Sequence, residues 1–214
     1  SPVGTPPAWD IPYPWGILTG WLVSSLFGLV IGTLYYTLVT QSILEGKLAW
    51  RKALADWPRN VFQVFLVSLA LLFFLIIISL PASCLLSLSA LAGFAAGQCT
   101  LVLYVSFLIW LLFPWVFSAY GIFVRQDTAL KSIQRGARLT RLTVLPTSML
   151  FMIVIALTQG LNMLWNVTAE NSWLSLIGII GHAIVTTGLL AASLLYYRDA
   201  DRWLENLSSR PKLA

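Results

Sequence analysis

The sequence predicts an all-α, polytopic transmembrane helical bundle with about five spans and two short cytoplasmic interfacial amphipathic helices. Of its 214 residues, 58% are hydrophobic and only 10% are charged, whereas a soluble domain carries about 25% charged residues. The length suits several spans of about 20 apolar residues each, and helices satisfy their own backbone polar groups in lipid. This composition excludes a soluble enzyme, a disordered chain and, despite a net charge of +5, a nucleic-acid-binding protein.

The chain opens with a proline-rich segment, residues 1–14, which has proline at positions 2, 6, 7, 12 and 14. Proline disrupts helix interiors and sheet ladders, so we expect an extended, non-cytoplasmic lead-in here. The segment begins with Ser1 rather than Met and lacks the basic region and apolar core of a signal peptide. We therefore expect a signal or a first helix upstream of residue 1.

Five apolar segments follow, each about long enough to cross the hydrocarbon core. They are Trp15–Val39, Asn60–Leu80, Thr100–Val124, Leu142–Trp165 and Trp173–Tyr197. Residues 15–197 are thus the expected transmembrane domain, followed by a cytoplasmic tail at residues 198–214. Within the third segment, Pro114 is expected to kink the helix or to mark a packing notch.

The stretch Pro81–Cys99 lies between the second and third spans, has no charged residue and is rich in Ser, Ala and Gly. It fits a re-entrant or surface-lying pair of turns, an extension of its neighbours, or an interfacial loop with a short helix. We favour the interfacial loop with a short helix.

The positive charges decide the predicted orientation. All 13 Lys and Arg residues lie between spans one and two, between spans three and four, or after span five. By the positive-inside rule these three segments are cytoplasmic, which places the N-terminus outside and the C-terminus inside. Cys84 and Cys99 then share the non-cytoplasmic side, where an oxidising compartment permits a disulfide; two reduced thiols are the alternative.

The two longer basic connections have amphipathic patterns. In Gly46–Pro58, three apolar residues recur at i, i+4 and i+7, and Pro58 is expected to end a short interfacial helix. The apolar residues are Trp50, Leu54 and Trp57.

The second amphipathic segment is Asp127–Arg141, where Asp127 or Thr128 can cap the helix. One face is lined by Leu130, Ile133 and Ala137. Basic residues of both connections are candidates for contacts with anionic lipid headgroups or an acidic partner segment; the alternative is a collar that only orients the chain. These residues are Lys47, Arg51, Lys52, Lys131, Arg135 and Arg138.

Small residues recur every four positions along the first span, and such a ladder favours close helix packing in lipid. The ladder consists of Gly16, Gly20, Ser24, Gly28 and Gly32. The contact is either internal, against the fifth span, or to a partner protein, and we favour internal packing.

Motifs for nucleotide binding, zinc ligation and nucleophilic catalysis are missing from the sequence, and no Asp or Glu lies within a predicted span. We therefore predict a non-enzyme with no cofactor or metal beyond lipids, although a pigment is compatible with the composition. The single histidine, His182, is a weak candidate for binding a metal or a pigment. A lone intramembrane histidine more often hydrogen-bonds a neighbouring helix, here through Gln159 or Asn162.

The segment FSAYGIFVRQDTALKSIQRGARLTRLTVLPTSMLFMIV, from Phe117 to Val154, resembles a repeated signature of a bacterial membrane-domain superfamily. That superfamily includes YciC-like proteins and the membrane domain attached to glycerophosphodiester phosphodiesterases. GTLYYTLVTQSILEGKLAWRKAL and GLLAASLLYYRDADRW resemble its first cytoplasmic connection and its closing end. The resemblance implies a bacterial inner-membrane protein with usually six spans, and it brings no catalytic domain.

The function that we predict is that of an accessory or scaffold subunit in a larger membrane complex. Its expected partners are membrane lipids and other integral membrane subunits, with no nucleic acid. The alternative is a small permease or export component.

Overall fold

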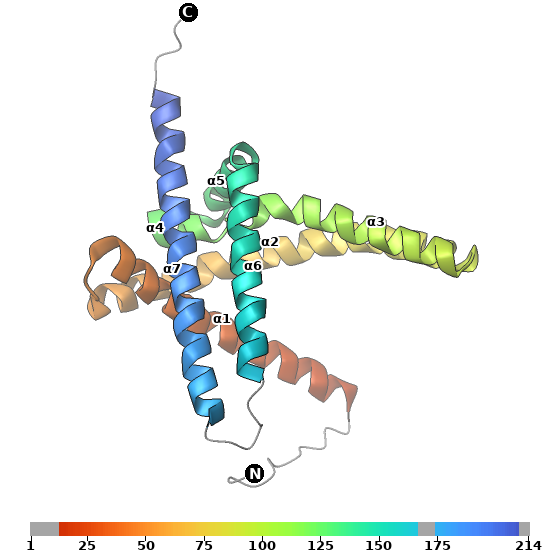
Figure 1. The fold of residues 1–214 in the computed structure, drawn as a ribbon, viewed down its shortest axis with the longest axis horizontal. Helices are drawn as coiled ribbons and strands as arrows, with labels where there is room; N and C mark the ends of the chain where they lie inside the picture. Colours follow the sequence, from red (N-terminus) through yellow and green to blue (C-terminus); the bar gives the residue numbers. More distant parts are fainter. Residues whose placement is uncertain (1–12, 167–173, 210–214) are drawn as a thin grey trace, which may run out of the picture. The chain divides into compact units, whose positions relative to one another are not determined.

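The computed structural model describes residues 13–166 and 174–209, which contain helices and no strand. The helices are α1 (Pro14–Glu45), α2 (Trp50–Leu91), α3 (Phe94–Leu112), the 3-10 turn η1 (Phe113–Trp115), α4 (Tyr120–Arg125), α5 (Ala129–Leu142), α6 (Val144–Asn166) and α7 (Leu174–Ser209) (Figure 1). The all-α class is confirmed. Most of the expected lead-in and Trp173, the expected start of the fifth span, lie outside the described residues.

Within the described residues, five helical stretches are long and apolar enough to cross a membrane, which is the character of a multi-pass membrane protein. They are Trp15–Glu45, Trp50–Leu91, Phe94–Arg125, Val144–Met163 and Leu176–Asn206. Helix α2 has 42 residues, so it is about 63 Å long, roughly twice the hydrocarbon thickness. A helix of this length must tilt in the bilayer or extend beyond it.

Two predictions about α2 were wrong. Gly46–Pro58 is not a separate interfacial helix ended by Pro58, because α2 begins at Trp50 and continues through Pro58. Pro81–Cys99 is not an interfacial loop either, because α2 also continues through Pro81 to Leu91. Each proline removes only one backbone donor, and the helical residues on both sides keep the other hydrogen bonds; membrane helices tolerate such prolines.

The chain turns instead at Gly93, between α2 and α3. Gly93 has φ 131° and ψ 159°, a conformation open to glycine but closed to residues with a side chain. The favoured interpretation of Pro81–Cys99 is therefore replaced by its alternative, an extension of both neighbouring spans.

The kink expected at Pro114 is confirmed. Helix α3 ends at Leu112, and Pro114 occupies the middle of η1, after which the chain resumes as the short helix α4. The missing N–H of proline and its clash with the preceding turn explain why the regular helix stops here.

The chain divides into two compact units, and the first contains residues 1–54 and 144–199. Within it, the hydroxyls of Tyr35 and Thr187 lie 2.6 Å apart and join α1 to α7. A 3.0 Å hydrogen bond between Thr147 and Tyr196 joins α6 to α7. Buried polar side chains on α1 continue this polar interior: Thr33, Thr37, Thr40 and Gln41.

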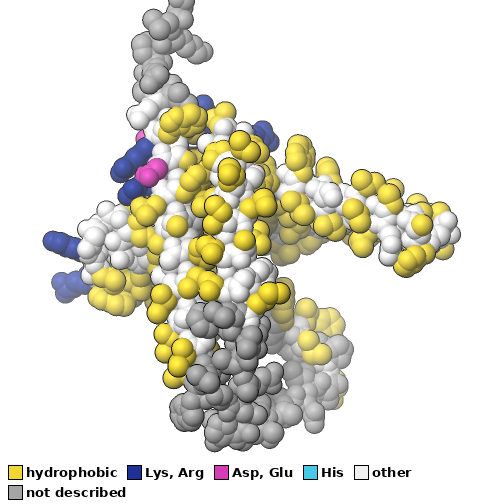
Figure 2. Space-filling model, in the orientation of Figure 1, with side chains coloured by type: hydrophobic (Ala, Val, Ile, Leu, Met, Phe, Trp, Pro, Cys, Tyr) yellow, Lys and Arg dark blue, Asp and Glu magenta, His cyan; other side chains and the backbone are white. Residues whose placement is uncertain are grey.

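The second unit contains residues 55–143 and 200–214. Its core includes Val67 of α2, Ile122 of α4 and Ala129 of α5. Helices α2 and α3 lie side by side as an antiparallel hairpin, joined by a 2.8 Å hydrogen bond between Ser79 and Tyr104 (Figure 1). Figure 2 shows hydrophobic side chains along the length of this hairpin, as expected of a surface in contact with lipid.

Candidate functional site

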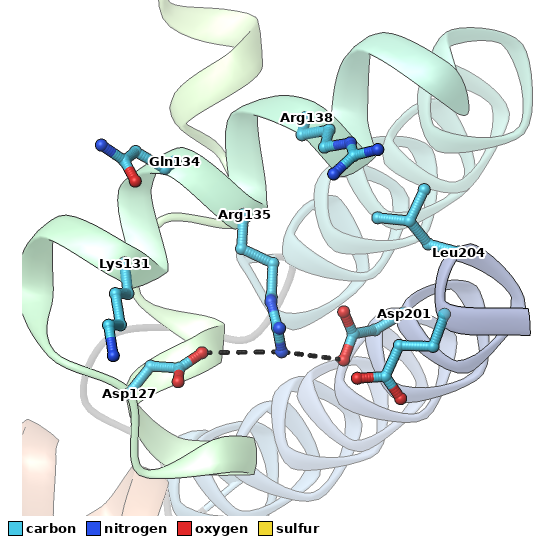
Figure 3. Close-up of a pocket in the computed structure, with 8 residues that line it drawn as sticks. Asp127, Lys131, Gln134, Arg135, Arg138, Asp201 and Leu204 are labelled. Carbon is cyan, nitrogen blue, oxygen red and sulfur yellow. Dashed lines mark ion pairs between the residues drawn. The ribbon is translucent and has the colours of Figure 1, made fainter. Parts of the chain in front are cut away.

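Charged side chains of α5, of the residue that precedes its N-cap and of the end of α7 surround a cavity of about 410 Å³ in the second unit. We call this cavity the ionic pocket (Figure 3). Its lining residues are Asp127, Lys131, Gln134, Arg135, Arg138, Asp201, Leu204 and Glu205. The predicted amphipathic helix in Asp127–Arg141 is confirmed as α5 and forms one wall.

Two hydrogen bonds from other segments hold the start of α5 in place. Thr128 occupies the N-cap position but makes no side-chain cap hydrogen bond. Instead, the backbone N–H of Ala129 donates to Oε1 of Gln63 on α2, at 2.7 Å. The side chain of Ser132 donates to the carbonyl of Ser118 at 2.5 Å. The start of α5 is thus fixed from outside the helix.

Gly136 lets α5 approach the preceding segment closely. A Cβ at this position would lie 2.8 Å from the carbonyl carbon of Phe117 and 2.9 Å from its oxygen. The buried face of α5 is therefore made mainly of small residues, whereas Leu130, which the pattern placed on an apolar face, is 66% exposed. Packing against the backbone at Phe117 explains this rotation, because only a small side chain fits there.

Arg135 bridges the two sides of the pocket. Its Nη1 lies 3.7 Å from a carboxylate oxygen of Asp127 and 3.7 Å from one of Asp201 (Figure 3). Arg125, the last residue of α4, pairs with Asp201 and with Glu205 on the same face of α7. These pairs fasten the end of α7 to the α4–α5 region.

Several buried polar atoms in the pocket have no hydrogen-bond partner among the described residues. They are Nη1 of Arg135, Oδ2 of Asp127 and Oδ1 of Asp201. The side chain of Asp201 is only 3% exposed. Buried polar groups normally find hydrogen bonds, so these atoms leave capacity for a polar ligand or water.

Lys131 and Arg138 lie on α5 either side of Arg135 (Figure 3). Both are exposed, and within the described ranges neither side chain has an ion pair or hydrogen bond. The α5 wall thus carries available positive charge, whereas the α7 wall carries the carboxylates of Asp201 and Glu205. The pocket can offer an anion and a cation separate places.

The remaining basic candidates lie in the first unit. Lys52 forms an ion pair with Glu45. Lys47 and Arg51 are exposed and have no ion pair within residues 13–166 and 174–209. The structure brings Lys131, Arg135 and Arg138 together at one cavity, but it does not bring Lys47, Arg51 and Lys52 to that cavity.

His182 is exposed on α7. Its backbone carbonyl accepts a bond from Thr186, but its imidazole makes no hydrogen bond to Gln159 or Asn162, both of which are also exposed. The described residues contain no group of three or more His, Cys, Asp or Glu that could hold a metal ion.

The small-residue ladder of α1 has open space beside it in the described structure. A Cβ added to Gly20, Gly28 or Gly32 would meet nothing within 4 Å. The structure therefore gives no support for internal packing at these three positions. The other two residues of the ladder are on the same helix; Gly16 is half-buried and Ser24 is exposed.

Cys84 on α2 and Cys99 on α3 are both free and exposed. The disulfide considered from the sequence is thus not formed in the structure. With α2 and α3 continuous as helices on either side of Gly93, packing along the hairpin holds this part of the chain.

Sequence reasoning missed the acidic half of the ionic pocket. Residues 198–214 were expected to be a tail, yet α7 stays helical to Ser209 and places Asp201 and Glu205 one turn apart. The i, i+4 spacing of two carboxylates was the available signal. Nothing in the sequence showed that Arg125 and Arg135 would meet them.

Comparisons with protein-family models, with curated proteins and with solved structures gave no match for this chain. The likeness to the YciC-like superfamily therefore remains an expectation from the sequence, and the site must be interpreted from its own geometry.

Proposed function

We propose that this protein is a non-catalytic, multi-pass accessory or scaffold subunit that binds another integral membrane protein. The observation that carries the proposal is a set of exposed polar side chains in the C-terminal half of α6 and the N-terminal half of α7: Gln159, Asn162 and His182. They lie within or beside apolar helices, and no side-chain partner is recorded for them in the described part of the chain. A polar group facing lipid without a partner is unfavourable, whereas a neighbouring helix can supply hydrogen bonds.

Lipid contact is the second part of the proposed role. Little of each apolar helix is buried. In α1, α2 and α6 alike, only 6% of the residues in the most apolar 18-residue window are buried. Such surfaces suit hydrocarbon or the apolar faces of a partner. We place the protein in a bacterial inner membrane with its N-terminus outside, on the basis of the charge distribution and the resemblance.

The test is a pull-down in mild detergent, followed by mass spectrometry. We expect a stoichiometric membrane partner with the parent chain and its loss from the double variant Gln159→Leu and Asn162→Leu. Gln98→Leu is the matched control, because Gln98 is also an exposed glutamine on an apolar helix but belongs to the second unit. Retention of the partner by the double variant, or no partner with the parent chain, would contradict the proposal.

A small permease is the second candidate, and one buried residue favours it. Gln41 on α1 is 7% exposed, and neither atom of its side-chain amide has a hydrogen-bond partner among the described residues. Oγ1 of the adjacent Thr40 is also buried without a hydrogen-bond partner among the described residues. Polar groups inside membrane helices often mark a path for a polar solute. A solute that raises the melting temperature of the parent chain but not of Gln41→Leu would favour transport.

A further inference from the structure

We propose that the ionic pocket binds an aminoalkyl phosphate zwitterion, and that its source is the headgroup of phosphatidylethanolamine. The phosphate meets Arg138 and Lys131 on the α5 wall, and the ammonium meets the carboxylate of Asp201 on the α7 wall. The inference deepens the lipid-contact part of the proposed function and does not depend on the partner protein.

The lining of the ionic pocket carries both signs of charge in equal number. Three lining residues are basic and three are acidic: Lys131, Arg135, Arg138, Asp127, Asp201 and Glu205. A simple anion would face three carboxylates, and a simple cation would face three positive groups; each would be repelled by half of the lining. A ligand that carries both charges is attracted by both halves.

The anionic end has two available partners. Arg138 and Lys131 are exposed, line the pocket and have no ion pair in the described ranges. Arg135 differs, because its charge is already shared between Asp127 and Asp201. Guanidinium groups bind phosphate through paired, charge-assisted hydrogen bonds, so Arg138 is the main phosphate contact and Lys131 supplies a second charge.

The cationic end has buried acceptors. Oδ2 of Asp201 accepts a hydrogen bond from Arg125, but Oδ1 of the same carboxylate is buried and has no hydrogen bond among the described residues. Oδ2 of Asp127 is also buried without one. A primary ammonium has three N–H donors and can donate to Oδ1 of Asp201, whereas the quaternary ammonium of phosphatidylcholine has none.

One apolar side chain in the lining, and two that precede lining residues in the sequence, favour a lipid as the source over a free metabolite. Leu204 lines the pocket itself. Trp203 on α7 and Leu130 on α5 are exposed by 49% and 66%. Tryptophan and apolar residues beside basic ones are typical of helices at the headgroup level of a membrane.

The experiment uses the full chain in detergent and in phosphatidylcholine nanodiscs that contain equal fractions of phosphatidylethanolamine and phosphatidylglycerol. Native mass spectrometry counts the lipids that stay bound. We expect phosphatidylethanolamine to be retained about tenfold over both other lipids, the factor expected for one charge-assisted hydrogen bond. Soluble glycerophosphoethanolamine should displace it only at a large excess.

The double variant Arg138→Gln and Lys131→Gln should abolish this preference. The control Lys47→Gln and Arg51→Gln removes the same charge from exposed residues outside the pocket and should keep it. Equal or better retention of phosphatidylglycerol, or an unchanged preference in the Arg138 and Lys131 variant, would overturn the proposal while leaving the partner pull-down unaffected. Displacement by glycerophosphoethanolamine at equal concentration would overturn the lipid as the source.

Discussion

Nη1 of Arg135 lies 3.7 Å from Oδ2 of Asp201, close enough for an ion pair but too far for a hydrogen bond. The same carboxylate oxygen accepts a hydrogen bond from Nε of Arg125. Asp201 is therefore held between two guanidinium groups while its side chain is almost fully buried. This arrangement makes the charge of Asp201 the link between the end of α7 and the α4–α5 region.

Asp201→Asn should lower the free energy of unfolding by about 3–5 kcal/mol, because it leaves two arginines without their shared buried anion. Thermal unfolding in detergent measures the effect. Asp199→Asn is the control: Asp199 pairs with Arg198 on the surface, and its side chain is 63% exposed, so the expected change is below about 1 kcal/mol. Equal melting of both variants would show that the Asp201 pairs do not stabilise this unit.

Gly136→Ala should destabilise the protein by about 1–3 kcal/mol, because the new Cβ would overlap the backbone of Phe117. Gly160→Ala on α6 is the matched control, since a Cβ there meets nothing within 4 Å. The control should be neutral or stabilising by up to about 1 kcal/mol, from the better helix propensity of alanine. Circular dichroism melts of the two variants decide the matter. Unchanged stability of Gly136→Ala would mean that α5 can move away from Phe117 at little cost.

The helices were predictable because long apolar runs have few alternatives in a membrane chain. The kink at Pro114 followed from the same reasoning. The prolines of α2 are the exception: Pro58 and Pro81 predict helix ends, but a long apolar helix can lose one hydrogen bond and continue. The turn is at Gly93, one of two glycines in Pro81–Cys99, and composition does not show which of the two adopts a positive φ.

The candidate site was predictable only in its basic half. Periodicity placed Lys131, Arg135 and Arg138 near one another on a single helix, because neighbours in sequence decide that arrangement. Their partner Asp201 is more than 60 positions away in the sequence, and its approach depends on tertiary packing of α7. For the same reason, only the structure shows that Arg135 pairs with Asp127 and Asp201.

Reporter fusions test the proposed orientation. A reporter that is active only outside the cytoplasm should work after Gly93, between α2 and α3, and stay silent after Gln126, between α4 and α5. The reason is that every basic connection should remain on the cytoplasmic side. Fusions of a reporter that is active only in the cytoplasm should give the opposite pattern at both sites and serve as the control. Activity of the first reporter after Gln126 would reverse the topology.

The thiols of Cys84 and Cys99 should both react with an alkylating reagent in denaturant without prior reduction, because the structure has them free and exposed. Intact-protein mass spectrometry then shows two added groups. A sample reduced before alkylation is the control and should give the same mass.

Reductant should also leave the melting temperature unchanged. A bridge across this loop of about 15 residues would contribute roughly 3 kcal/mol in the chain-entropy model, so its loss would be visible. The α2–α3 hairpin relies instead on the hydrogen bond between Ser79 and Tyr104 and on the contact of Gly97 with Ala90. Labelling that appears only after reduction would contradict the structure and show that the oxidised protein closes this hairpin covalently.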